Sequence, residues 1–479
     1  MPITPSTTNV SSILKSIRDI MRDDNGLSGD AQRLEQLGWM IFYKIFCLKE
    51  AELTIMNSNY HSTLPSHLRW ESWAEDDEGI TGEALIEFVD RTLFPHLRDL
   101  EVENNNKRGQ IVKNVFNGNN NYMKSGTILR KVITKLNQIN FDSMSDRHAF
   151  GDLYEQMLKT LQDNKASGEF YTPRAITSFM VDMIDPKYNE SILDPACGTG
   201  GFLTCAINYI HDNSKIDNQK RLEMQDNILG WECKPLPFLL CNTNLILHDI
   251  EEPNLRYGDS LDRPISDFKL KDKVDIILAN PPFGGNVAHG YETNFPKEFQ
   301  TKESADLFLV MIIHLLKEGG RSAIVLPDGS LTGGGVKSRI RQRLLEECNL
   351  HTIVRLPNSV FQPYASVATN LLFFTKGEPT KDIWYYEHRL PVGQKTYSKT
   401  KTIQKTEFDP IKAWWDNRVE SDICWKMGID EIKKRDWDLD IKNPTQLEEE
   451  HEYSSSELLE QIMESMTTSQ ELIKQLKQD

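Results

Sequence analysis

Between residues 190 and 377 the chain alternates short apolar runs with helical stretches, and this pattern constrains its fold more than any other feature. Seven candidate strands follow one another: SILDPA, NILGWEC, LRYGDS, KVDIILAN, RSAIVLP, HTIVRLP and TNLLFFTKG. Because their apolar residues are nearly continuous and helices separate several of them, we expect a doubly wound, mostly parallel α/β sheet. Ligands of such sheets bind beyond the carboxyl ends of the strands.

The chain before this region reads mainly as helix. In DAQRLEQLGWMIFYKIFCLKEAE the apolar residues recur at helical spacing. We expect three domains: a helical domain at 1–150, the sheet domain at 151–400 and a C-terminal helical region at 401–479. The first domain either serves the structure alone or also contacts a nucleic acid or a partner.

The C-terminal part of the chain becomes polar and Lys-rich beyond residue 378, and Pro444 marks a further boundary. The tail after it opens with a capping box formed by Ser454 and Glu457. A heptad seam follows, made of Leu459, Ile462, Met466, Ile473 and Leu476. This tail helix either packs on its own domain or docks on another subunit.

Charge and composition exclude several classes of protein. The 55 Lys and Arg residues against 71 Asp and Glu residues give a net charge of −16. This balance argues against a broad basic surface that holds nucleic acid unaided, but it allows a subunit that works beside a more basic partner. Seven scattered cysteines without a CxxC pair fit a reducing cytosol, and we expect no metal site. Without a secretory signal or a membrane-spanning run, we expect a cytoplasmic protein.

A glycine-rich stretch, LDPACGTGGF, ends the first candidate strand and opens a helix. Gly198, Gly200 and Gly201 allow a sharp turn and a close approach of the backbone to a ligand. Asp194 stands before them, where a carboxylate would repel a pyrophosphate but suit a cationic ligand. The stretch therefore indicates a ligand loop that is not of the dinucleotide type, with a purely structural turn as the alternative.

Two more acids follow the next two candidate strands. Glu232 ends the second strand, where an acid can accept hydrogen bonds from both hydroxyls of a ribose. Asp259 follows the third strand, where its carboxylate can accept from an adenine amino group. Either acid alone would be read as a solvated loop residue, but three acids at successive strand ends favour an adenosine-type ligand.

The fourth strand ends in Asn-Pro-Pro-Phe, residues 280–283. Because Pro281 and Pro282 lack N–H groups, the carbonyls of this turn face no competing local donors. Asn280 adds a side-chain carbonyl, so two acceptors can bind one amino group and favour its attack on an electrophilic methyl. Phe283 offers a ring on which a planar base can stack after it has been flipped from a duplex. The polar stretch 284–303 that follows is long enough to be a lid.

These motifs together resemble a known family. NPPF with DPACGTGGF resembles the amino-methyltransferases that use S-adenosylmethionine. ASGEFYTPR, VFQPYASVATNLLFF, LDIKNP and the helical N-terminal region extend the resemblance, over nearly the whole chain, to the modification subunits of type I restriction–modification systems. The resemblance implies a seven-stranded, Rossmann-like methyltransferase sheet and an enzyme that methylates the N6 amine of adenine in DNA.

The same resemblance implies roles for individual residues. The segment that covers the cofactor comprises Gly168, Glu169, Phe170, Tyr171, Thr172 and Pro173. The loop that borders its methionine part comprises Asp194, Pro195, Gly198, Thr199, Gly200 and Gly201. Glu232 holds the ribose and Asp259 the adenine amine of the cofactor. The target base is held by Asn280, Pro281, Pro282 and Phe283, with Phe361 as the second stacking aromatic and Tyr364 as the alternative to it.

The resemblance also implies partners: DNA, a specificity subunit that reads the sequence, a second copy of the chain in an M2S1 complex, and a restriction subunit in some assemblies. Two other functions remain open on the residues alone. One is methylation of a protein glutamine or an RNA base, whose amines suit the same turn. The other is a scaffold that binds cofactor or DNA without turnover.

Overall fold

The computed structural model describes residues 7–102, 106–141, 171–215, 217–283, 285–362, 367–398 and 400–445, with residues 151, 154, 158, 463 and 466. The chain divides into two compact units, Met1–Ile441 and Lys442–Asp479. The predicted tail helix lies outside the described residues except at Met463 and Met466, which are helical and exposed. Within the described part of the chain, no helix combines the length and apolarity that a membrane span requires.

The sheet of the first unit contains all seven predicted strands. They are β1 (Ile192–Asp194), β2 (Ile228–Glu232), β3 (Asn254–Tyr257), β4 (Val274–Ala279), β5 (Leu316–Pro327), β6 (Cys348–Leu356) and β7 (Thr369–Lys376). Strands β1 to β5 are parallel, and β7 runs antiparallel between β5 and β6. The expectation of a doubly wound, mostly parallel sheet is therefore confirmed.

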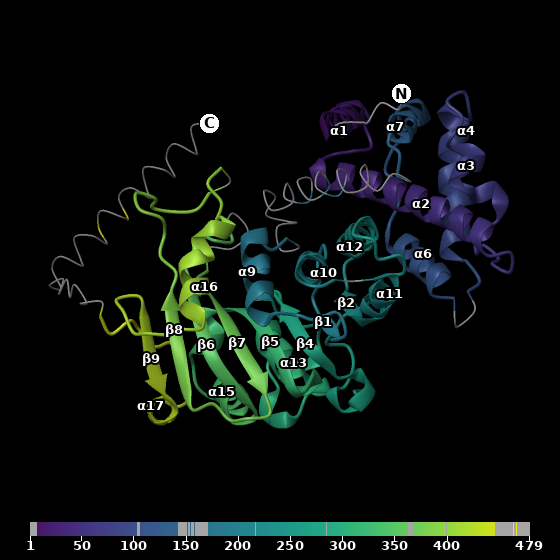
Figure 1. Ribbon diagram of the computed structural model, residues 1–479. Helices are drawn as coiled ribbons and strands as arrows, with labels where there is room; N and C mark the ends of the chain where they lie inside the picture. The colour runs from purple at the N-terminus through teal and green to yellow at the C-terminus, as the bar shows by residue number, and fades with distance from the viewer. Residues whose placement is uncertain are drawn as a thin grey trace. The chain divides into compact units, whose positions relative to one another are not determined.

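Two further strands extend the sheet beyond the predicted seven. They are β8 (Asp382–Glu387), parallel to β6, and β9 (Cys424–Gly428), antiparallel to β8. Among the described residues the strand order is β3-β2-β1-β4-β5-β7-β6-β8-β9 (Figure 1). Since β9 lies inside the predicted C-terminal helical region, part of 401–479 belongs to the sheet; the domain boundaries at 150 and 400 remain predictions.

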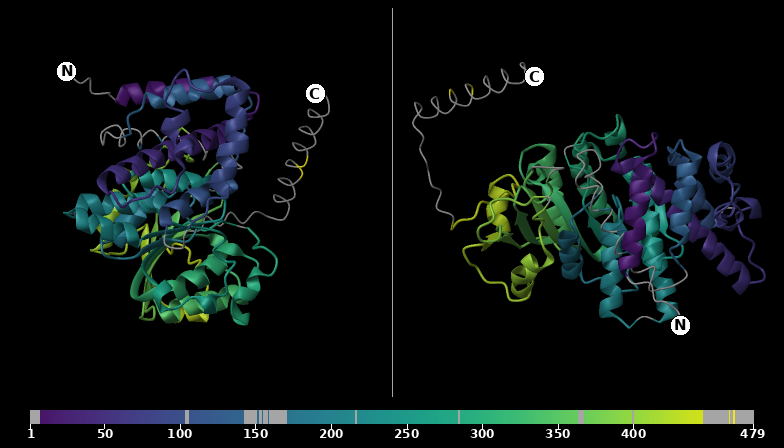
Figure 2. Two further views of the ribbon diagram at one scale, coloured as in Figure 1. Left: turned by 90° about the vertical axis from the view of Figure 1, so that its right-hand side faces the viewer. Right: turned by 90° about the horizontal axis from the view of Figure 1, so that it is seen from above.

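Helices cover both faces of the sheet, as Figure 2 shows from two further directions. One face packs against α9 (Arg174–Ile184), α10 (Gly201–Asn213), α11 (Asn218–Asn227), α12 (Pro235–Leu247) and α16 (Asp409–Trp415). The other packs against α13 (Ser304–Leu315), α15 (Val336–Glu347) and α17 (Ile429–Lys434), while α14 (Asp328–Leu331) follows β5 directly. Strand β4 divides its side chains accordingly: Ile276 and Leu278 enter the first core, Ile277 and Ala279 the second.

The N-terminal region is helical, as predicted. Its helices are α1 (Thr7–Arg22), α2 (Asp30–Met56), α3 (Trp70–Trp73), α4 (Gly82–Glu87), α5 (Phe94–Arg98), α6 (Lys107–Gly118) and α7 (Gly126–Asn137). Helix α2 runs through the centre, and its Trp39, Phe42 and Tyr43 are fully buried. The core of this region also takes Phe238 and Leu239 from α12, so the region and the sheet domain share one helix.

Short 3₁₀ and π turns complete the described structure. They are η1 (Ser66–Leu68), η2 (Phe88–Leu93, a π turn), η4 (Ile265–Asp267), η5 (Leu270–Asp272), η6 (Tyr291–Asn294), η7 (Lys297–Phe299) and η8 (Lys405–Phe408). Two of them, η6 and η7, lie in the long loop between β4 and α13.

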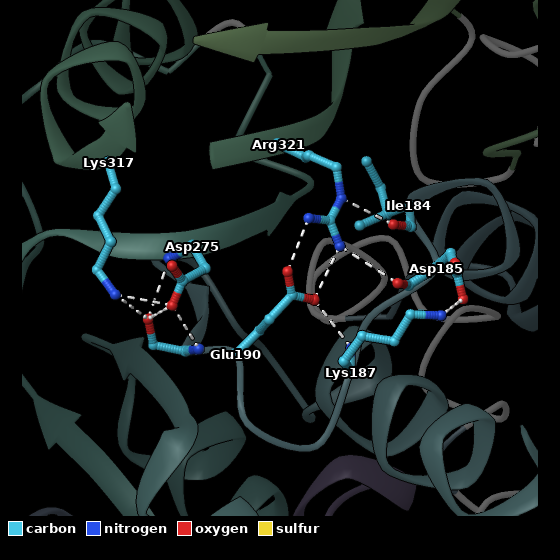
Figure 3. A network of polar contacts seen from close by, with 8 residues as sticks. Ile184, Asp185, Lys187, Glu190, Asp275, Lys317 and Arg321 are labelled. Atoms are coloured by element: carbon cyan, nitrogen blue, oxygen red, sulfur yellow. Dashed lines mark hydrogen bonds and ion pairs between the residues drawn. The ribbon is translucent and has the colours of Figure 1, made fainter. Parts of the chain in front are cut away.

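A polar network at the amino edge of the sheet fixes the end of α9 (Figure 3). Arg321 of β5 binds both carboxylate oxygens of Glu190 at 2.8 Å. Its Nε donates to the carbonyl of Ile184 at 3.0 Å, and Nη2 donates to that of Asp185 at 3.2 Å, which satisfies carbonyls at the end of the helix. Helix α9 begins directly after Thr172 and Pro173 and ends at this network. The network therefore fixes the end of the helix that lies farther from Thr172.

Candidate active site

One cavity of about 270 Å³ lies beyond the carboxyl ends of β1, β2, β3 and β4. The acids expected at the ribose and the adenine amine, Glu232 and Asp259, line it together with Asn280. The remaining lining residues are Pro195, Ala196, Gly198, Trp231, Cys233, Lys234, Ser260, Leu261, Pro282, Gly285, Asn286, Val287, Ala288, Ser304 and Phe308. Residues predicted from three separate motifs therefore meet in a single site.

The glycine loop turns back on itself through two left-handed residues. Gly198 has φ of 53° and Gly200 has φ of 82°, values that residues with a Cβ seldom adopt. Thr199 between them is buried, and its carbonyl accepts a hydrogen bond of 3.0 Å from Nδ2 of Asn244. Gly201 then begins α10. Only Pro195, Ala196 and Gly198 of this loop reach the cavity, so the glycines after Gly198 shape the turn from behind.

Glu232 is held rigidly at the end of β2. Its two carboxylate oxygens accept backbone N–H groups, from Gly198 at 2.9 Å and from Lys234 at 2.7 Å. Burial raises the pKa of this carboxyl, and the backbone donors act in the opposite direction. Asp259 is half-buried, and its Oδ1 accepts the N–H of Leu261 at 3.0 Å. Each acid retains acceptor capacity toward the cavity, because a carboxylate can accept about four hydrogen bonds.

Asp194 lies behind the cavity and does not line it. Its side chain is 1% exposed, and Oδ1 accepts the N–H of Ala196 at 3.0 Å. Burial, with a smaller effect of the nearby Glu232, raises the pKa of Asp194 to about 8. Burial therefore favours the neutral form of this carboxyl near neutral pH, unlike the carboxylate expected from the sequence.

Asn280 presents an unpaired oxygen at the end of β4. Its Nδ2 donates to Oγ1 of Thr172 at 3.0 Å, whereas Oδ1 is buried and meets no donor among the described residues. In the same turn, the carbonyl of Pro282 accepts from Oγ of Ser304 at 3.0 Å, and no described donor occupies the carbonyl of buried Pro281. A buried acceptor without a partner is costly, which points to a ligand that donates to it.

The two predicted stacking aromatics touch each other. The rings of Phe283 and Phe361 lie 5.6 Å apart between centroids at 88°, an edge-to-face pair. Phe283 is half-buried, and Phe361 is 4% exposed within the core. The two rings therefore lie close enough to form one aromatic wall. Tyr364, the alternative aromatic, lies outside the described residues.

The segment expected to cover the cofactor is described only from Tyr171 onward, and Gly168, Glu169 and Phe170 lie outside the described residues. Tyr171 is buried in the core of the N-terminal helical region, and Pro173 caps α9. Thr172 between them is half-buried and contacts Asn280. The described part of the segment thus joins the helical region to the Asn-Pro-Pro-Phe turn.

Two groups of cavity-lining residues were not predicted from the sequence motifs. Ser304 and Phe308 come from the first turns of α13, which reads in the sequence only as an apolar helix. Residues 285–288 belong to the long loop, whose ends are joined by the pairing of Asn286 with Glu303 and of Val287 with Lys302. Because the two ends of the loop are paired, residues 285–288 are held at the wall of the cavity.

The arrangement combines acceptors for two amines with acceptors for hydroxyl groups. Glu232 and Asp259 suit a nucleoside, and the Asn280 turn suits the amino group of a second planar molecule. Among the described residues, no group of three or more His, Cys, Asp or Glu side chains is placed to hold a metal ion. The site can therefore offer hydrogen-bond acceptors to two planar molecules.

Comparison with known proteins agrees with this geometry. A family model described as N-6 DNA Methylase matches residues 145–453, and one described as HsdM N-terminal domain matches residues 10–136. The type I restriction enzyme EcoEI methylase subunit of Escherichia coli is 51% identical over 478 residues, which cover 98% of this chain and 97% of that protein.

Solved structures extend the likeness to three dimensions. A chain from a study of complex assembly and conformational transition in the type I R-M system superposes with a TM-score of 0.85 at 32% identity, covering 99% of this chain and 98% of that one. A modification subunit ascribed to a type I restriction enzyme of Vibrio vulnificus YJ016 gives a TM-score of 0.81 at 41% identity, covering 94% and 99%. The chain belongs to the N-6 DNA methylase family, as a modification subunit of the type I restriction–modification class.

Proposed function

We propose that the chain transfers a methyl group from S-adenosylmethionine to the exocyclic N6 amine of adenine in double-stranded DNA, within a complex whose specificity subunit reads the sequence. The observation that carries this proposal is the meeting of Glu232, Asp259 and Asn280 in one cavity, with Oδ1 of Asn280 buried and unpaired. A purified complex with its specificity subunit, labelled cofactor and host DNA, followed by nucleoside analysis for N6-methyladenine, tests it.

The residues present fit the cofactor. Gly198 brings the backbone close, Glu232 is rigid enough to hold a ribose, and Asp259 can accept from an adenine amine. When bound, S-adenosylmethionine supplies an electrophilic methyl group on a positively charged sulfur. The same assay with RNA and protein fractions separates this proposal from methylation of an RNA base or a protein glutamine.

The Asn280 turn would activate the adenine. An aromatic amine is a weak nucleophile because its lone pair is delocalised into the ring. Oδ1 of Asn280 and the carbonyl of Pro281 can each accept one amine proton, which favours the build-up of positive charge on nitrogen during attack. Phe283 offers the stacking surface for a base that has left the duplex.

Thr172 acts as a positioning residue for Asn280. Its hydroxyl accepts from Nδ2 at 3.0 Å and so places the amide with Oδ1 toward the turn. A flipped amide would instead direct two N–H donors at an amine that also donates. Because α9 is fixed at its far end by Arg321, the position of Thr172 follows from the packing of the helix on the sheet.

Loss of the Asn280 amide should abolish methyl transfer. In Asn280→Ala we expect no detectable N6-methyladenine, since the principal acceptor for the amine is removed, while cofactor affinity stays within about twofold of the wild type because the cofactor acids are untouched. Equilibrium cofactor binding and a methylation time course measure the two effects. A comparable loss of cofactor binding would contradict this division of roles.

Replacing Thr172 by the isosteric valine should slow the chemical step. Thr172→Val leaves the partly buried Nδ2 of Asn280 without its acceptor, and we expect the single-turnover methylation rate at saturating cofactor to fall about tenfold. Thr172→Ser keeps the hydroxyl and should retain most of the rate. If the valine variant instead weakened cofactor binding and kept the saturated rate, Thr172 would be a cofactor ligand only.

Replacing Asp194 by asparagine should separate stability from binding. The native pKa of about 8 lies above the unfolded value of about 4, so wild-type stability falls as pH rises through this window. Asp194→Asn cannot ionise, and we expect its melting temperature to exceed that of the wild type by a margin that grows from pH 5 to pH 8. Cofactor affinity at neutral pH should stay within about twofold of the wild type, because burial already favours the neutral form of the wild-type carboxyl, which does not line the cavity. Equal melting profiles would show that burial does not disfavour the carboxylate.

Deleting the tail should weaken assembly and leave the first compact unit folded. Residues 445–479 lie in the second unit, and Met466, the seam position that is described, is 59% exposed. We expect the truncated chain to keep the melting temperature of the full chain but to co-elute poorly with the specificity subunit in gel filtration. A large drop in melting temperature would place the tail in the core instead.

A further inference from the structure

One stretch of this acidic chain is basic. Residues 388–405, here called the basic segment, contain five Lys or Arg residues and no Asp or Glu, in a protein of net charge −16. Lys395, Lys401 and Lys405 are exposed. None of the three forms an ion pair with a carboxylate of the described residues, whereas Arg389 pairs with Glu387 and Asp422.

The basic segment leaves the sheet at the edge that carries the active site. It follows β8, which is parallel to β6 with Arg355 beside Glu387. Strand β7 runs antiparallel to both β5 and β6, so β8 points the same way as β4, and their carboxyl ends meet at one edge. Asn280 ends β4 at this edge, and the basic segment starts there.

The segment is anchored beside the stacking aromatics. The N–H of Tyr397 donates to Oγ of Ser359 at 3.0 Å, two residues before Phe361. Tyr397 and Ile403 are buried in the core cluster that contains Phe361 and contacts Phe283. Between these two anchors the backbone closes a tight turn, since Ser398 and Lys401 exchange N–H···O bonds of 3.0 and 3.1 Å. Tyr397 and Ile403 thus face inward, whereas Lys395, Lys401 and Lys405 are exposed.

Glu407, the first acid after the basic segment in the sequence, bonds to groups other than the three lysines. Glu407 accepts from the hydroxyl of Tyr397 at 2.5 Å and from the N–H of Gln404 at 2.7 Å. Among the described residues, Glu407 forms no ion pair with Lys395, Lys401 or Lys405. Three ammonium groups on an anchored loop, next to the place where the target base enters, are the chemistry that a row of phosphates requires.

We propose that the basic segment, through Lys395, Lys401 and Lys405, binds the phosphate backbone of DNA next to the flipped adenine. This rests on the proposed function of the same site. The contact positions the duplex without reading its sequence, and so supplies positive charge beside the target base in a chain of net charge −16.

The test uses the full chain in complex with its specificity subunit. The variant Lys395→Gln/Lys401→Gln/Lys405→Gln is compared with the wild type in binding a duplex that carries the target site, from 50 to 200 mM KCl. Each lost phosphate contact should lower the slope of log affinity against log salt by about 0.9, so the triple variant should be less steep by about 2.7. At 100 mM salt we expect affinity to fall at least about tenfold. Cofactor affinity should not change.

A matched control changes the same charge elsewhere. Lys269, Lys271 and Lys381 are exposed and precede β4 or β8, at the opposite edge of the sheet. The variant Lys269→Gln/Lys271→Gln/Lys381→Gln should keep the wild-type salt slope. If both triple variants gave equal slopes, the basic segment would not be a phosphate site.

Further outcomes distinguish a failure of the phosphate-binding proposal from a failure of the proposed function. Weakened assembly with the specificity subunit, at unchanged DNA affinity of the assembled complex, would assign the lysines to an acidic protein surface and overturn the proposal. A wild-type complex that methylates adenine while the triple variant shows no change in DNA binding would overturn the inference alone. Absence of methylation by the wild-type complex would overturn the proposed function instead.

Discussion

The parallel register of β1, β2, β3 and β4 is the constraint on which the site depends. Asp194 is level with Gly230 in β2, and Glu232 is level with Tyr257 in β3. Leu193 is level with Ile277, three residues before Asn280. These pairings bring groups far apart in the sequence to one edge. A slip of one residue in any pair would turn the side chains to the other face of the sheet, so the apolar cores on both faces protect the geometry of the cavity.

The sequence carried enough signal for the sheet and for the acids at its edge. All seven expected strands formed. Strands such as β1, β4 and β7 are largely buried and therefore apolar, and such runs stand out, whereas β3 at the edge of the sheet is only partly buried. Glu232, Asp259 and Asn280 line the cavity because parallel strands end together. Strands β8 and β9 were missed, since they lie at the end of the sheet within a polar, Lys-rich stretch where the apolar signal is short.

Other features of the site depend on distances that no local pattern encodes. The bond from Asn280 to Thr172 joins residues 108 positions apart, and Ser304 reaches the turn from a helix with no polar motif. For Asp194, the sequence did not reveal that the side chain is buried. Its position before the glycines suggested a charge facing the ligand, whereas its burial behind the loop decides its protonation. The sequence showed where the strands end, but it did not show how deeply a side chain is buried or which distant residues it contacts.

The N-terminal helical region is part of the methylase fold rather than an appended module. Helix α12 begins three residues after Glu232, and its Phe238, Leu239 and Leu240 are at most 1% exposed within the core of that region. Fully burying side chains of this size contributes about 1.5–3 kcal/mol each, so separation of the region would cost several kcal/mol. On the other side of the cavity, Tyr171 enters the same core directly before Thr172. The helical region therefore supports the site twice, behind Glu232 and behind Thr172, and a rearrangement of its core would alter both positions together.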